Sequence, residues 1–179
     1  MKIRNGFVSN SSSSSFVVAF PKKPENQQEL QDMMFTSFQQ SISLYDNNVS
    51  TEEICRLVFH EICDQEESAN EDEIADHFYG LRDQELSSVF GGTPYVLDRA
   101  PKRKDFDTND EFEEADRSFW RNESDEDLRY AKERAQEFMK ENKGAFILCT
   151  SYSDHKKIES IMEHGNIFRN LEHIKIDNH

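Results

Sequence analysis

Residues Ala145–Thr150 read AFILCT, and this continuous apolar run decides what fold the chain can adopt. A strand with both faces covered by other parts of a protein has this composition, because neither face needs polar side chains. After it, apolar residues recur at helical spacing up to Gly165, and residues 171–176 (LEHIKI) alternate as a second, more exposed strand. Strand, helix and strand within about 30 residues predict a right-handed βαβ unit over residues 145–179.

The start of the chain supplies a third strand for the same sheet. Residues 1–20 read MKIRNGFVSNSSSSSFVVAF, and the apolar run 16–20 stops at Pro21. We expect a strand or a hairpin here, with the polar serine tract leading into it or lying within it. These elements predict one α/β or α+β domain over residues 1–179, a length that can bury a single core.

Residues 25–143 predict a helical region between the strands. Apolar residues recur every three or four positions, and a capping residue followed three positions later by an acid marks several helix starts. The first helix is expected within residues 25–45, and the last is expected to break near Asn122 and to bury Leu128. The starts marked by a capping residue are Ser50, Asn70 and Thr108.

Negative charge is concentrated in the same region. The chain has 36 Asp and Glu against 21 Lys and Arg, a net charge of −15. Residues 61–142 hold 25 of the acids and 11 of the bases, so they carry −14 of that total. Because affinity for nucleic-acid phosphates comes from Lys and Arg, direct nucleic-acid binding by this acidic middle is disfavoured. A protein with a basic surface is the partner that it would attract.

Nine carboxylates in two clusters are the candidate partner-binding residues. They can be a solvated helix face, or they can imitate a phosphate backbone and occupy the basic groove of a nucleic-acid-binding protein. Basic residues interspersed among them count against the second interpretation, because they pair at i, i+4 and dilute the charge. The nine are Asp110, Glu111, Glu113, Glu114, Asp116, Glu123, Asp125, Glu126 and Asp127.

Two clusters of hydroxyl groups are candidate ligand sites. Clustered serines beside a strand can hold an anion, but this tract lacks the glycines of a P-loop and can equally be a low-complexity leader or a target for modification. The loop expected after AFILCT lies where α/β folds bind phosphate, although helix capping explains the same residues without a ligand. The candidates are Ser11, Ser12, Ser13, Thr150, Ser151, Ser153, Asp154 and His155.

Patterns for metal, cofactor and nucleophile are weak. His60, Cys63 and His77 are the best metal-ligating group, but they do not match the H-E-x-x-H spacing, so we expect no metal and no cofactor. Cys55, Cys63 and Cys149 are expected to be free buried thiols. No G-x-S-x-G elbow is present and no catalytic residue is assigned, so enzyme activity is not favoured. No stretch approaches the ~20 apolar residues of a membrane span, and no membrane association is expected.

The opening string resembles that of a known set of proteins. MKIRNGFVSNSSSSSFVV is similar to the start of small uncharacterised tailed-phage and prophage proteins, which begin K-x-R-x-G-F-V-S-N-S-S-S-S-S-F. The resemblance covers about 18 of the 179 residues and carries no activity and no catalytic residue with it. It implies a phage-type protein located in the host cytoplasm or in the virion.

Three functional hypotheses follow. The favoured one is a phage accessory protein that works by protein–protein interaction, and that inhibits or redirects a host nucleic-acid-binding protein through its acidic helices. The second is a small nucleotide- or phosphate-binding enzyme that uses the loop Thr150–His155. The third is a minor structural component of the virion. The sequence leaves the oligomeric state and the strand order open.

Overall fold

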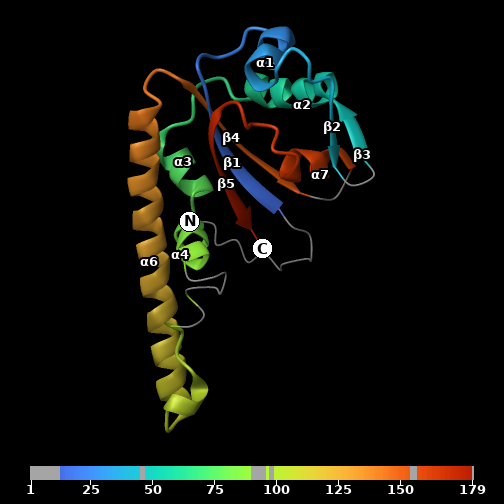
Figure 1. Ribbon diagram of the computed structural model, residues 1–179. Helices are drawn as coiled ribbons and strands as arrows, with labels where there is room; N and C mark the ends of the chain where they lie inside the picture. Colours follow the sequence, from blue (N-terminus) through green and yellow to red (C-terminus); the bar gives the residue numbers. More distant parts are fainter. Residues whose placement is uncertain (1–12, 45–46, 90–95, 97–98, 154–156, 179) are drawn as a thin grey trace. The chain divides into compact units, whose positions relative to one another are not determined.

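The computed structural model describes residues 13–44, 47–89, 96, 99–153 and 157–178 (Figure 1). Contacts within the chain divide it into two compact units. We call Met1–Ala69 with Asn142–His179 the sheet unit, and Asn70–Glu141 the helical unit. That residues 1–179 form a single domain stays a prediction.

The sheet unit is built on three strands from the two ends of the chain. These are β1 (Ser13–Phe20), β4 (Phe146–Ser153) and β5 (Glu172–Asn178), in the order β4-β1-β5. β1 is antiparallel to both neighbours and lies between them in Figure 1. The expectation of an α+β fold whose sheet is built from N-terminal and C-terminal strands is confirmed.

The C-terminal strand, helix and strand are present, but the two strands are not neighbours. The helix α7 (Lys157–His164) connects β4 to β5, and β1 separates these two strands in the sheet. The most completely buried strand, β1, therefore takes the position with pairing partners on both sides. Val17, Val18 and Phe20 of β1 have no exposed surface, which is what burial on both faces of a central strand requires.

β4 continues to Ser153, so the strand expected over residues 145–150 is longer at its end, and the loop expected after it is wrong for residues 151–153. The cause is the pairing register, which places the end of the serine tract beside these residues. Ser13, Ser14 and Ser15 pair with Ser153, Tyr152 and Ser151 respectively. A paired neighbour thus holds polar residues in a strand that their own propensities would not predict.

One face of the sheet carries the main core. Phe16, Val18 and Phe20 of β1 pack with buried residues of α7 and of two further helices, α1 (Gln27–Met34) and α2 (Thr51–Asp64). Phe16 has edge or tilted contacts with Phe168 and Tyr152, at ring-centroid distances of 5.5 and 5.6 Å. Large aromatic rings therefore give a chain of low apolar content a well-filled core.

The helix expected within residues 25–45 ends early, and a β-hairpin follows it. After α1 the backbone turns extended at Phe35, and β2 (Ser41–Leu44) pairs with β3 (Asn47–Ser50). Ile42 lies opposite Val49, and both pack against the core from this hairpin. Phe38, which fits the helical stripe, is instead 93% exposed. Apolar residues spaced for a helix were here shared between a helix and a strand.

The outer edge of β4 is covered by the segment that follows α2. Gln65 donates its side-chain N–H to the Ile147 carbonyl at 2.7 Å and accepts from the Cys149 N–H at 3.3 Å. Ser68 Oγ accepts from the Ile147 N–H, and the Ala69 N–H donates to the Ile147 carbonyl, both at 2.9 Å. These groups satisfy backbone atoms that an edge strand otherwise leaves open.

In the described residues of the helical unit we find α3 (Glu71–His77), α4 (Leu81–Val89), the 3-10 turn η1 (Arg103–Asp105) and the long α6 (Asn109–Glu141). The caps predicted at Asn70 and Thr108 are both present. Gly80 has a positive φ of 87° and makes the turn between α3 and α4, a conformation that other residues rarely adopt. α6 carries on through Asn122, where a break was expected.

The core of the helical unit is small. Phe78 meets Phe138 edge-on at 6.1 Å, with Ile74, Ala131 and Ala135 buried nearby along the α3 and α6 faces. Leu128 was expected in this core, but it is 43% exposed. It lies outside the core because the inner face of this part of α6 is occupied by carboxylates. None of the described helices is both long and apolar enough to span a membrane.

Candidate functional site

The end of the serine tract lies among charged side chains of the sheet unit. Ser14 is fully buried, and its Oγ lies 2.7 Å from Asp177 Oδ1 and 3.2 Å from Glu163 Oε1. Lys175 Nζ contacts the same Asp177 oxygen at 2.7 Å, and Glu163 is within 3.5 Å of His164. The tract therefore ends in a closed polar cluster.

This cluster is unsuited to the chemistry that a serine tract suggests. A nucleophilic hydroxyl has to be reached by its substrate, and Ser14 has no exposed surface. Two carboxylates converge on the same hydroxyl, so a phosphate group there would be repelled. The described part of the tract thus supports neither an anion site nor a nucleophile at Ser14.

The hydroxyl groups of the predicted loop are used within the fold. Ser15 and Ser151, which are paired across the strands, share a hydrogen bond of 3.1 Å. Thr150 and Tyr152 both donate to Glu61 Oε2 on α2, at 2.9 and 2.7 Å. Burial raises the pKa of the Glu61 carboxyl, and the bonds from the two hydroxyls offset this only in part. Burial also raises the pKa of Tyr152, and the adjacent Glu61 raises it further.

The structure gives no contacts for four of the eight predicted ligand residues. Ser11, Ser12, Asp154 and His155 lie outside the residues that the structure describes. Ser13 and Ser153 are backbone pairing partners at the end of the β1–β4 pair. A hollow of about 490 Å3 in the sheet unit is lined by Gln27, Gln31, Gln40 and hydroxyl groups, and by none of the predicted ligand residues.

The group considered for metal binding is not assembled. His60 is exposed and pairs with Asp64 at 2.9 Å. Cys63 is exposed, which corrects the expectation that it is buried, whereas Cys55 is buried and its pKa is raised to about 12 by that burial. Across the described ranges no three His, Cys, Asp or Glu side chains are arranged to hold a metal ion.

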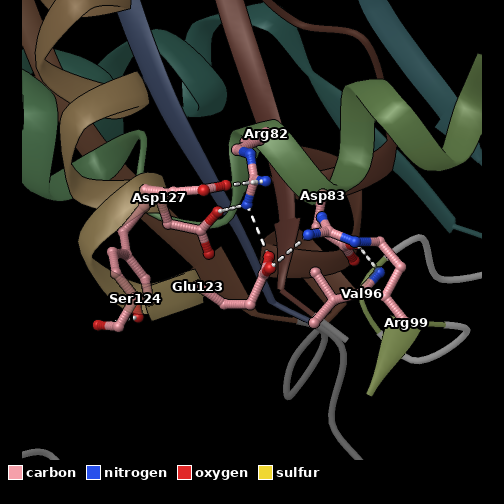
Figure 2. Close-up of polar contacts among 9 residues, drawn as sticks. Arg82, Asp83, Val96, Arg99, Glu123, Ser124 and Asp127 are labelled. Carbon is pink, nitrogen blue, oxygen red and sulfur yellow. Dashed lines mark hydrogen bonds and ion pairs between the residues drawn. The ribbon is translucent and has the colours of Figure 1, made fainter. Parts of the chain in front are cut away.

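The middle of α6 holds an ion-pair cluster that was not predicted. Figure 2 shows Arg82 of α4 reaching the carboxylates of Glu123 and Asp127, at 2.9 and 3.1 Å. Arg82 also binds Glu126, and Arg99 binds the second oxygen of Glu123 at 3.1 Å. Glu123 is only 5% exposed. We call Glu123, Glu126 and Asp127 the inner carboxylates.

The electrostatics of this cluster favour paired charges. Burial opposes the charge on Arg82, but its bonds to Glu123 and Asp127 outweigh that effect and raise its pKa. Burial raises the pKa of Asp127, and the bond and charge of Arg82 lower it only in part. The inner carboxylates therefore hold α4 against α6, and the side chains of Glu123 and Asp127 are largely covered, whereas that of Glu126 is 43% exposed.

The remaining carboxylates of the two clusters have a different environment. Five of them are exposed, and we call them the outer carboxylates: Asp110, Glu111, Glu113, Glu114 and Asp125. Glu111 caps the helix by accepting from the Thr108 N–H, and Glu113 faces Arg117 at 3.9 Å on the open surface. Asp116 is half-buried and accepts from Trp120 Nε1 at 3.0 Å.

The sequence suggested that interspersed basic residues offset the negative charge of α6, and the structure shows such pairing for only some of them. Arg134 pairs with Glu137 and Glu85, and Lys132 contacts Asp72 of α3 at 3.8 Å. For Arg121 and Arg129 the described part of the chain offers no ion pair. The outer carboxylates thus keep most of their charge, with Arg117 as the one basic group in direct contact among the described residues.

Comparisons with protein-family models, with curated proteins and with solved structures find no match for this chain. The candidate functional site is therefore identified by its geometry alone. Of the surfaces described above, the exposed side of α6 is the one whose charged groups are not consumed by the fold.

Proposed function

We propose that this chain is a phage-type accessory protein that binds a protein with a basic surface through the outer carboxylates of α6. By occupying that surface it inhibits or redirects a host nucleic-acid-binding protein in the host cytoplasm. The phage assignment is supported by the opening string, and the choice of partner by the charge on α6.

One observation carries the proposal: the separation of the α6 carboxylates into two groups. The inner carboxylates are paired with Arg82 and Arg99, whereas the outer carboxylates face solvent. A row of exposed negative charge on a rigid helix attracts a basic partner and steers its approach. The helical unit as a whole holds 21 acids against 11 bases, a net charge of −10.

The test is affinity capture from a bacterial lysate, with the retained proteins identified by mass spectrometry. The wild-type chain is compared with a variant that carries Asp110→Asn, Glu113→Gln, Glu114→Gln and Asp125→Asn. We expect the wild type to retain basic nucleic-acid-binding proteins, and the variant to lose them. Exposed charges are screened by salt, so capture should also fall steeply between about 0.05 and 0.5 M salt, and duplex DNA should compete for the retained proteins.

A matched control separates this surface from the net charge of the chain. Four exposed acids of the sheet unit, Glu25, Glu66, Glu67 and Glu172, are changed to Gln, so that both variants have lost the same charge. The control should capture the same proteins as the wild type. If the two variants lose the same proteins, or if no basic protein is retained by the wild type, the proposal is wrong.

A further inference from the structure

Three large apolar side chains are exposed together on the helical unit. Tyr79, Trp120 and Leu128 have exposed fractions of 50%, 42% and 43%. Trp120, Ser124 and Leu128 are spaced four residues apart, so they lie on one face of α6. Tyr79, from the turn after α3, shares a hydrogen bond of 3.2 Å with Ser124, which places it between the other two. We call these three side chains the apolar patch.

Local contacts hold the apolar patch in place. The indole of Trp120 donates to Asp116, one turn earlier on α6, and its ring meets Phe119 at 5.3 Å. Tyr79 is fixed to α6 through its hydroxyl. Aromatic side chains with restricted rotation lose little conformational freedom on binding, and Trp and Tyr dominate the energetics of many protein interfaces.

The charges around the apolar patch indicate what would cover it. Asp76, three residues before Tyr79 in the chain, is exposed, and Asp72 is exposed but lies 3.8 Å from Lys132. On α6 the patch follows the outer carboxylates Asp110, Glu113 and Glu114. Arg117, Arg121 and Lys132 also border it, so these surroundings hold five acids against three bases and are mixed in sign with a negative excess. An occupant with basic side chains around apolar ones complements this surface.

The spacing of the patch indicates the shape of the occupant. Trp120 and Leu128 are eight residues apart, about 12 Å along the helix axis. An amphipathic helix presents apolar residues at i, i+4 and i+7, over the same length. A helix lying along α6 can therefore cover all three side chains at once, with its polar face toward the surrounding acids.

We infer that the apolar patch of Tyr79, Trp120 and Leu128 is the anchor at which a basic amphipathic helix of the partner docks on α6. This inference rests on the proposed function, because it names the structural element that the basic partner uses. The outer carboxylates attract the helix and orient it. Its apolar side chains bury the patch and determine how long it stays bound.

The probe for this inference is a synthetic 18-residue peptide of Leu and Lys arranged as an amphipathic helix. A second peptide has the same composition in an order without amphipathic spacing. Trp120 is the single tryptophan of the chain, so its emission reports directly on the patch. We expect the amphipathic peptide to shift this emission to shorter wavelength on binding, and the reordered peptide to bind about tenfold more weakly.

Two variants test the patch itself. Leu128→Gln removes an apolar side chain and keeps a good helix former, and it should weaken binding of the amphipathic peptide about tenfold. Phe38→Gln makes the same kind of change at the exposed apolar residue of the sheet unit, and it should leave binding unchanged. Circular dichroism confirms that both variants keep their helix content.

The outcomes distinguish the inference from the function on which it rests. If both peptides bind equally, or if Leu128→Gln binds like the wild type, charge alone holds the partner and the anchor is disproved while the proposed function stands. If neither peptide binds, the inference is also overturned. The proposed function itself is decided separately, by the loss or retention of basic proteins in the capture experiment.

Discussion

The interior of the sheet unit and the interior of the helical unit are stabilised by different kinds of interaction. The sheet unit buries aromatic and branched side chains from β1, β4 and three helices, and its 15 acids and 10 bases give a net charge of −5. The helical unit has fewer large buried residues, and at its centre Arg82 binds three carboxylates. Its net charge is −10 over 72 residues against 107 in the sheet unit.

The difference teaches where each unit is vulnerable. Apolar burial is not weakened by salt, whereas the balance of paired charges depends on every partner being present. The two units can be followed independently, because Trp120 lies in the helical unit and Cys55 is buried in the sheet unit. The emission of Trp120 reports unfolding of the helical unit, and labelling of the Cys55 thiol reports unfolding of the sheet unit.

The largest effect is expected from Phe20→Ala in the middle strand. Phe20 has no exposed surface, and removing a buried ring costs about 3–5 kcal/mol of unfolding free energy. Thiol labelling of Cys55 during urea unfolding, with Cys63 and Cys149 replaced, measures this loss. Phe138→Ala is the matched change in the helical unit. Phe20→Ala should leave the Trp120 transition in place, and an equal shift of both signals would show that the units do not unfold independently.

Arg82→Met is expected to have the next largest effect, confined to the helical unit. It leaves Glu123, Glu126 and Asp127 without their shared cation, and removing one partner of a buried ion pair costs about 3 kcal/mol. The measurement is the urea midpoint of Trp120 emission. Arg82→Lys keeps the charge without the forked geometry and should lose less. A cost below about 1 kcal/mol for Arg82→Met would mean that apolar packing, and not the ion pairs, holds α4 on α6.

A smaller, pH-dependent change in unfolding free energy is expected when Glu61 of the sheet unit is changed to Gln. Burial raises its pKa in the folded state, so the folded chain holds this proton more tightly than the unfolded chain. The cost of the buried charge is present in full above the folded pKa, and it is relieved as the pH falls from there toward the unfolded value near 4.3. Glu61→Gln carries no such cost.

The measurement compares Glu61→Gln with the wild type from pH 8 to pH 5 by the Cys55 transition. The stability of the variant relative to the wild type should be greatest at pH 8 and should decline on acidification. Glu172→Gln, at an exposed residue, should show no such trend. A relative stability of Glu61→Gln that grows as the pH falls would contradict the sign of the pKa shift.

The smallest effect is expected at the outer carboxylates. Glu113→Gln with Glu114→Gln removes two exposed charges, one of them 3.9 Å from Arg117, and should change the unfolding free energy by less than about 0.5 kcal/mol. The Trp120 transition measures it. A loss approaching that of Arg82→Met would show that these side chains support the fold, and it would weaken their assignment to a partner.

Local sequence patterns predicted those elements of the fold that are determined by residues close together in the chain. The apolar run 146–150, the caps at Asn70 and Thr108, and the α7 face with Ile161 and Met162 can all be read from spacing. Each depends on residues within one or two turns of the chain. The pairing of the serine tract with β4 joins residues that are 136 or more positions apart, and no local pattern encodes it.

The candidate site was predictable in part for the same reason. The sequence indicated that α6 is acidic, but it did not separate the inner from the outer carboxylates. That separation is made by Arg82, which is 41 residues from Glu123 in the chain. The continuation of α6 through Asn122 has the same origin, since the helix must present Glu123 and Asp127 on one face to reach Arg82. The signal for the apolar patch was local, in the spacing of Trp120 and Leu128.

The central position of β1 has a consequence for how the chain folds during synthesis. Phe20 of β1 pairs with Phe146 of β4, which the ribosome adds 126 residues later. At 5–20 residues per second that interval is about 6 to 25 s. The helical unit, a continuous stretch from Asn70 to Glu141, can complete its contacts within that interval. The apolar strand meanwhile has neither of its neighbours, so chaperones that shield exposed apolar segments should meet the nascent chain at residues 16–20.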